Sequence, residues 1–185
     1  ISKKILLPKI DIVKLLIFKY AIMNIIIKKH HLLYRGYKLK CCFGKSGIKN
    51  LKKEGDFRTP KGIFNLGLLY YRKDRNKFLK IKIKNKIIKK NMGWCDDIRS
   101  KKYNQEIKFP FKNTAEKLYR KDKKYDLLIN IKYNHYPIVK GKGSAIFLHL
   151  TNKEYKPTRG CIAILKKDFL KILPLINEKT KISIK

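Results

Sequence analysis

The stretch Gly143-Ser-Ala-Ile-Phe-Leu-His149 is followed, after a turn-rich segment, by Pro157-Thr-Arg-Gly-Cys161-Ile-Ala-Ile164. Residues 145–150 form a short apolar run that is compatible with a buried strand ending near His149. Gly160 and Cys161 open a second apolar run. His149 and Cys161 are separated by twelve positions, which is too many for a metal-binding pair at i and i+4 of one helix. Two neighbouring strands joined by a loop would bring the two side chains together.

This pair of side chains has a defined chemistry. A free thiol with a pKa of about 8.5 is mostly protonated at neutral pH, and an adjacent imidazole can take its proton and later protonate a leaving amine. Gly160 would let a substrate approach the backbone, and N–H groups near Cys161 could bind an oxyanion, worth roughly 3–4 kcal/mol per donor. We expect Arg159 and the positive field to lower the pKa of Cys161. On spacing alone, a structural buried cysteine is the competing interpretation.

No Asp or Glu lies within four residues of His149 or of Cys161 in the sequence. The group that orients His149 is therefore expected to be a backbone carbonyl or a side chain distant in sequence.

The rest of the chain predicts a mainly β domain with a few short helices. We expect strands at the β-rich or alternating runs and helices where apolar residues recur with helical spacing. The expected strands are 24–27, 37–43, 63–71, 78–88, 125–133 and 145–150. The expected helices are 113–120, capped by Thr114, and 165–176, which Pro174 should bend or end.

We expect residues 23–185 to form a single domain, preceded by an uncertain N-terminal extension at 1–22. The segment Ile1 to Ile27 is apolar but broken by Lys14 and Lys19, and its uninterrupted stretch, Ala21 to Ile27, is too short to span a bilayer. No small-x-small cleavage site follows it. The sequence therefore predicts neither a stable membrane span nor a clear signal peptide.

The ordered set of motifs resembles the L,D-transpeptidase (YkuD-like) catalytic domains of the branch found in many Gram-negative bacteria. The His…Ser/Thr-x-Gly-Cys pattern of that family is similar to His149 with Thr158-Arg-Gly-Cys161. Further matching pieces extend the resemblance over roughly residues 25–180. They are Lys53-Glu-Gly-Asp56, Thr59-Pro-Lys-Gly62, Tyr71-Arg-Lys-Asp-Arg75, Trp94-Cys-Asp-Asp97, Tyr103-Asn104, Glu116-Lys-Leu-Tyr-Arg120, Tyr125-Asp126 and Tyr133-Asn134.

The resemblance implies a sandwich-like fold and a periplasmic or cell-envelope enzyme that acts on peptidoglycan stem peptides without metal or other cofactor. It implies Cys161 as nucleophile, His149 as general base, and Gly160 with Cys161 as the oxyanion-hole backbone. Thr158 would hold the turn and Ser144 would support the site. The cysteine would release a terminal D-amino acid and form a thioester, which an amine of another stem resolves into a cross-link.

Two departures from the family pattern concern substrate binding. Arg159 stands where many members carry histidine, and Ala163 stands where many carry asparagine or arginine. Arg159 could contact a substrate carboxylate, or it could simply be a solvated side chain. Water as acceptor would make the protein an L,D-carboxypeptidase or peptidoglycan hydrolase on the same scaffold.

The net charge of +35 raises a third alternative, a basic nucleic-acid-binding module. The lysines are spread over the whole chain, as A/T-rich codon bias would produce, and no nucleic-acid-binding motif is present. We therefore expect no nucleic-acid partner. The other cysteines, Cys41, Cys42 and Cys95, match no zinc spacing and are expected to be small buried side chains, although sequence alone leaves a disulfide open.

Overall fold

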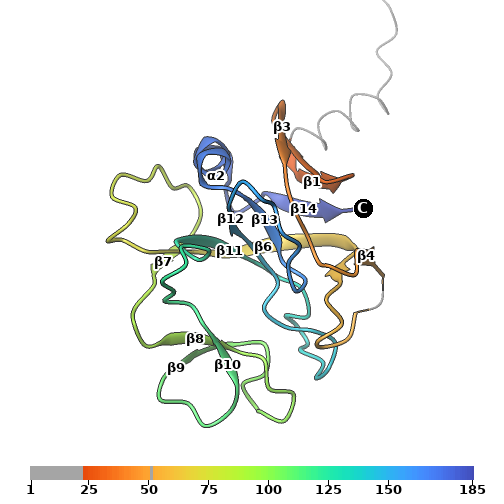
Figure 1. Ribbon diagram of the computed structural model, residues 1–185, viewed down its shortest axis with the longest axis vertical. Helices are drawn as coiled ribbons and strands as arrows, with labels where there is room; N and C mark the ends of the chain where they lie inside the picture. Colours follow the sequence, from red (N-terminus) through yellow and green to blue (C-terminus); the bar gives the residue numbers. More distant parts are fainter. Residues whose placement is uncertain (1–22, 51) are drawn as a thin grey trace, which may run out of the picture.

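A ten-residue strand, β6 (Gly62–Tyr71), connects the two halves of the main sheet in a computed structural model that describes residues 23–50 and 52–185. The first part of β6 pairs with β14 and the second part with β11, so the sheet runs β13-β12-β11-β6-β14-β1-β2-β3, with β7 also on β6 (Figure 1). The other strands are β1 (Ile25–Lys28), β2 (His31–Tyr34), β3 (Tyr37–Lys40), β7 (Asn85–Ile87), β11 (Leu127–Ile131), β12 (Phe147–Thr151), β13 (Ile162–Leu165) and β14 (Lys181–Ile184). The expected extension at 1–22 lies outside the described residues.

The main hydrophobic core is built by both halves of this sheet. Ile25 and Leu32 from one half share it with Ile129 and Leu148 from the other. Phe169, on the helix α2 (Lys166–Ile172), is fully buried in the same core. Because successive residues of a strand point to opposite faces, one face of each central strand is committed to this core.

The opposite face of β11 and β12 packs into a second hydrophobic cluster. Leu128, Phe147 and Cys161 lie there with Trp94. Trp94 comes from a separate three-stranded sheet in the order β10 (Ala115–Lys117), β8 (Met92–Cys95), β9 (Glu106–Lys108). A two-stranded sheet of β4 (Ile48–Lys49) and β5 (Thr59–Pro60) completes the strands. The candidate site lies on this second face of the main sheet.

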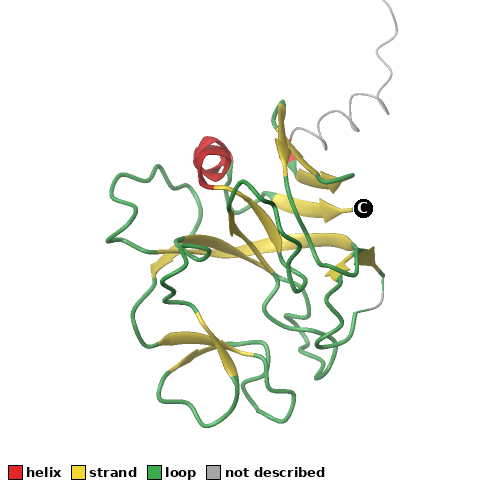
Figure 2. Cartoon of the chain, in the orientation of Figure 1, coloured by secondary structure: helices red, strands yellow, loops and turns green. Residues whose placement is uncertain are grey.

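The structure confirms the mainly β fold class and its sandwich-like character, with strands predominating over helix (Figure 2). The helix expected at 165–176 is also confirmed. It forms as α2 and a following 3-10 helix, η1 (Leu173–Leu175). Pro174 lies in the first turn of η1, which agrees with its predicted role in ending the α-helix.

The helix expected at 113–120 is wrong. Residues 115–117 form β10, which pairs antiparallel with β8 in the register Ala115↔Cys95. Thr114 donates its hydroxyl to Asp96 at 2.8 Å and caps no helix. The short segment has little apolar surface to bury as a helix, and the free edge of β8 offers it backbone hydrogen bonds instead.

The strand expected at 78–88 is also largely wrong, because only Asn85–Ile87 forms a strand. Residues 78–84 do alternate between buried and exposed side chains. Their backbone makes one bridge, Lys82↔Asn177, and reaches β6 only at its end, where Lys84 O accepts from Leu69 N–H. The alternation therefore correctly predicted which side chains turn towards the core. It did not predict a strand, because a strand also needs a neighbouring backbone to pair with.

All four cysteines are buried and free, so the expectation of small buried side chains is confirmed. Within residues 23–50 and 52–185, none of the helices combines the length and the apolar character that crossing a membrane requires.

Candidate active site

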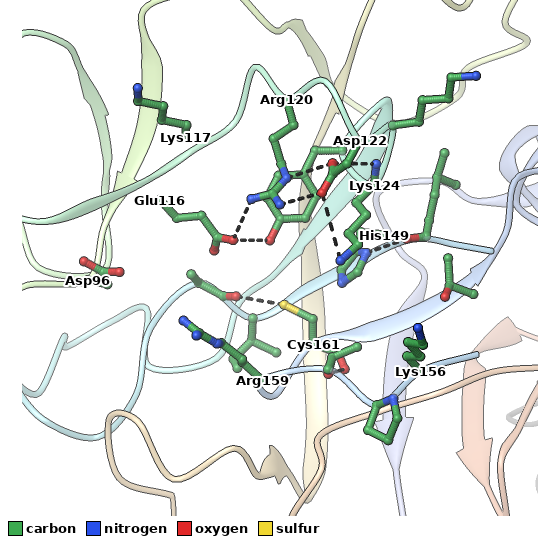
Figure 3. A pocket seen from close by; sticks show the side chains of 18 of the residues that line it. Asp96, Glu116, Lys117, Arg120, Asp122, Lys124, His149, Lys156, Arg159 and Cys161 are labelled. Atoms are coloured by element: carbon green, nitrogen blue, oxygen red, sulfur yellow. Dashed lines mark hydrogen bonds and ion pairs between the residues drawn. The ribbon is translucent and has the colours of Figure 1, made fainter. Parts of the chain in front are cut away.

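An open cleft on the second face of the main sheet contains five of the six predicted site residues. They are Ser144, His149, Thr158, Arg159 and Cys161, and Gly160 is buried beside them. The remaining walls come from the segment 114–126 and from the loop that follows β4. In Figure 3, the side chains of Cys161 and His149 lie on the same side of the cleft, across from Glu116 and Arg120.

The register of two parallel strands places the cysteine and the histidine on one face. β12 and β13 pair with Leu148 opposite Ile162 and His149 opposite Ala163. Continuing that register by one residue sets Cys161 beside Phe147, whose backbone N–H donates to Cys161 Sγ at 3.4 Å. Since residues two apart in a strand share a face, Cys161 and His149 project from the same face at diagonal positions.

His149 is held in one orientation by a backbone carbonyl. Its Nδ1 lies 2.8 Å from Leu150 O. A carbonyl only accepts, so Nδ1 carries the proton and Nε2 of the neutral ring is left as a proton acceptor. Burial, assisted by the charges of Lys124 and Arg120, lowers the pKa of His149 to about 4. The ring is therefore neutral at neutral pH, and of the two expected orienting groups the backbone carbonyl is the one present.

Cys161 rests as a neutral thiol. Its Sγ donates to Ala145 O at 3.1 Å, and no hydrogen bond joins it to His149 among the contacts of the described chain. Burial and the charge of Glu116 raise the pKa of Cys161 to about 12, although the Phe147 N–H and Lys52 act in the opposite direction. The expectation that Arg159 and the positive field would lower this pKa is wrong for this conformation, because burial of the thiol outweighs the cations.

Arg159 is exposed and directs its guanidinium over the ring of Phe57, at 5.9 Å from the ring centre. The buried Lys52 is the cation that acts on the thiol. Lys52 is itself ion-paired with Asp56 at 2.9 Å. Sequence reasoning missed it, because one lysine among so many carries no distinguishing signal.

The turn before the cysteine is closed by Thr158. Its hydroxyl donates to Cys161 O at 2.6 Å and accepts from Gly160 N–H at 3.1 Å. Gly160 has φ +138°, and a Cβ there would lie 2.8 Å from Arg58 O. Only glycine fits this combination of backbone angle and close approach. The Gly160 N–H is occupied by Thr158 in this conformation, so it is not presented to the cleft as an oxyanion donor.

The segment 143–145 forms the opposite lip of the thiol pocket. Ala145 has φ +51°, an unusual value for a residue with a Cβ, and its N–H donates to Asn104 Oδ1 at 3.0 Å. The same amide oxygen accepts from Trp94 Nε1. Asn104 therefore links Trp94 of the small sheet to Ala145, the residue whose carbonyl accepts the Cys161 thiol proton. Ser144 is buried in the cleft wall just before Ala145.

The profile of the YkuD family, described as the L,D-transpeptidase catalytic domain, matches residues 21–184. The chain belongs to the YkuD family. None of the curated proteins is similar enough to this chain to count as a match.

This YkuD domain surrounds His149 with a polar network that sequence reasoning quoted only as motif pieces. Tyr125 packs on His149 with ring centroids 5.2 Å apart and donates its hydroxyl to Glu116 at 2.7 Å. Arg120 lies over the Tyr125 ring and 3.7 Å from Glu116. Burial raises the pKa of Glu116, and Tyr125 and Arg120 oppose that rise. The motif order Glu116…Arg120…Tyr125 was the available signal, but placing residues 113–120 on a helix hid its position at the cleft.

Proposed function

We propose that this domain is an L,D-transpeptidase in which Cys161 is the nucleophile and His149 is the general base. The observation that carries the proposal is the placement of both side chains on one face of paired parallel strands, inside the same cleft. The proton-accepting Nε2 of His149 supports the same assignment. The family acts on peptidoglycan, so the donor substrate is a stem peptide.

The chemistry starts from two neutral groups. Cys161 leaves Ala145 O, gives its proton to His149 Nε2, and its sulfur attacks the acyl carbon of the donor peptide. Because the thiol pKa is raised and the imidazole pKa is lowered, proton transfer accompanies the attack and does not precede it. His149 then returns the proton to the departing amine of the terminal D-amino acid, which leaves a thioester on Cys161.

The second half-reaction restores the enzyme. An amine of an acceptor stem attacks the thioester carbon and loses a proton through His149, and the thiol of Cys161 is released with the proton. A new peptide bond remains between the two stems. We assign the Cys161 N–H as an oxyanion donor, and Thr158 with Gly160 as the turn that holds it in place. Ser144 supports the opposite lip, and Arg159 is available at the rim for a substrate carboxylate.

The test is intact-mass analysis after incubation with a carbapenem, an acylating agent that a reactive nucleophilic thiol opens. We expect one covalent adduct on the wild type, mapped to Cys161, and none on Cys161→Ser. Cys95→Ser is the matched control, because Cys95 is equally buried and free, and it should keep the adduct. A folded wild-type protein that takes up no carbapenem would contradict the proposal.

The product of the reaction separates the transpeptidase from the hydrolase. With purified stem tetrapeptides, an amine acceptor yields a cross-linked dimer and water yields a shortened monomer. Mass spectrometry of the products distinguishes them directly. Shortened monomer alone, dependent on Cys161, would identify an L,D-carboxypeptidase on the same catalytic machinery.

A further inference from the structure

The segment between β6 and β7 presents a fully solvated aromatic side chain. Phe78 is 100% exposed. The segment projects from the side of the main sheet, away from β14 and β1 (Figure 1). A phenyl group in water is unfavourable. Single exposed apolar residues are common on protein surfaces, so Phe78 is informative only together with the charged side chains that flank it.

Side chains of this segment alternate between the core and solvent. Leu79 and Ile81 pack against the main core and Ile83 is buried in it. Phe78, Lys80 and Lys82 are exposed between them, so the phenyl group shares its outward face with lysines. Residues 77–90 contain no Asp or Glu. Their lysines are all exposed, namely Lys77, Lys80, Lys82, Lys84, Lys86, Lys89 and Lys90.

Both ends of the segment are fastened to the domain. Asn76 is buried and donates to Arg72 O and Asp126 O at 3.0 and 2.9 Å. At the other end, Leu69 N–H donates to Lys84 O at 2.9 Å, and Lys82 bridges Asn177. The ends of the segment are therefore fixed to the domain, and Phe78 lies between them in solvent.

The lysines nearest to Phe78 are electrostatically unpaired within the described part of the chain. Ion pairs are formed further along, by Lys84 with Glu178 and by Lys86 with Glu106. Lys77, Lys80 and Lys82 form none with any described residue. An exposed apolar side chain flanked in sequence by exposed lysines without ion pairs is complementary to an anionic membrane surface, which is apolar inside and lined by phosphates outside.

We propose that residues 77–84 are a docking loop for the anionic surface of a lipid bilayer. Phe78 enters the boundary between headgroups and acyl chains, and Lys77, Lys80 and Lys82 contact lipid phosphates. Soluble polyanions without an apolar surface would satisfy the lysines equally well but would leave the phenyl group in water, whereas a bilayer satisfies both. The inference is independent of the proposed function, because it uses no residue of the cleft.

Two substitutions of the full chain test the loop with vesicles of phosphatidylcholine mixed with phosphatidylglycerol. In co-sedimentation, Phe78→Ser should weaken partitioning roughly tenfold or more at a salt concentration that screens charge-only binding. Tyr136→Ser is the matched control, since Tyr136 is a 95% exposed aromatic in another loop, and it should bind like wild type. Phe78→Trp provides a reporter, because the single native tryptophan, Trp94, is buried. Its emission should shift to the blue and be quenched by lipid-borne bromine, whereas that of Tyr136→Trp should not.

Three outcomes overturn the proposal. Equal vesicle binding by wild type and Phe78→Ser would mean that the net charge alone drives association. An unshifted and unquenched emission from Phe78→Trp would mean that the side chain stays in water. Binding of a single-stranded oligonucleotide that depends on Phe78, with none to vesicles, would mean that the ring stacks on bases instead. Phe78 makes no core contact, so matching thermal unfolding of the variants checks that the fold is intact.

Discussion

Tyr125 stands edge-on against the imidazole of His149, at 5.2 Å between ring centroids and 74° between ring planes. Its hydroxyl donates to Glu116 Oε1 at 2.7 Å. Glu116 belongs to β10 of the small sheet, and His149 belongs to β12 of the main sheet. Tyr125 therefore connects the two sheets, because its hydroxyl binds a residue of the small sheet while its ring packs on a side chain of the main sheet.

Removing the Tyr125 hydroxyl should loosen this connection while keeping the ring. Tyr125→Phe leaves the half-buried Glu116 carboxyl without its phenolic donor, which should lower the free energy of unfolding by about 1 kcal/mol. We also expect several-fold slower acylation of Cys161 by a carbapenem, because His149 loses a fixed neighbour. Urea denaturation and time-resolved intact mass measure the two effects. Tyr136→Phe, at an exposed position, should change neither. An unchanged Tyr125→Phe protein would show that the hydroxyl is dispensable.

The buried imidazole should make stability depend on pH. Burial holds the pKa of His149 near 4, with Lys124 and Arg120 adding to the effect, whereas an unfolded histidine titrates near 6.5. Between these values the unfolded chain binds more protons than the folded one. The free energy of unfolding should therefore fall as pH drops from about 6.5 to about 4, by on the order of 3 kcal/mol, and His149 adds no further loss below that window.

Chemical denaturation across this pH range measures the slope. His149→Gln should flatten it relative to wild type, because the titrating group is gone, whatever the variant's absolute stability. His30→Gln, at an exposed position outside the cleft, should retain the wild-type slope. A slope that persists in His149→Gln would assign the pH dependence to other groups.

A methyl group at Gly160 should disturb the turn before the nucleophile. Gly160→Ala combines an unfavourable backbone angle with a Cβ placed 2.8 Å from Arg58 O. Gly36→Ala is the matched control, because Gly36 also has a positive φ, +83°, but has open space around the same position. We expect Gly36→Ala to cost about 1 kcal/mol and Gly160→Ala clearly more, together with loss of carbapenem acylation. Equal losses in both variants would mean that the contact with Arg58 is easily relieved.

The strands around the cleft were predictable because their pattern is local. An apolar run bounded by turn residues identified β12, and alternation or β-branched residues identified β1, β6 and β11. The same local reasoning failed at 113–120 and at 78–84. In the first case the free edge of β8 supplied hydrogen bonds that helix propensity does not register. In the second case side chains alternated without a neighbouring strand.

The spacing of Cys161 and His149 allowed the two side chains to meet, since strands joined by a loop commonly lie side by side, and the family resemblance indicated their roles. Their protonation states were not readable from the sequence. The raised pKa of Cys161 comes from burial and from Glu116, which is 45 residues away in the chain. The choice of Lys52 over Arg159 as the nearby cation, and of Tyr125 as the wall beside His149, likewise depends on segments that meet only after folding. The order and spacing of residues along the chain determine which chemistry is possible. The protonation states depend on burial and on nearby charges, and both arise only when the completed fold brings distant segments together.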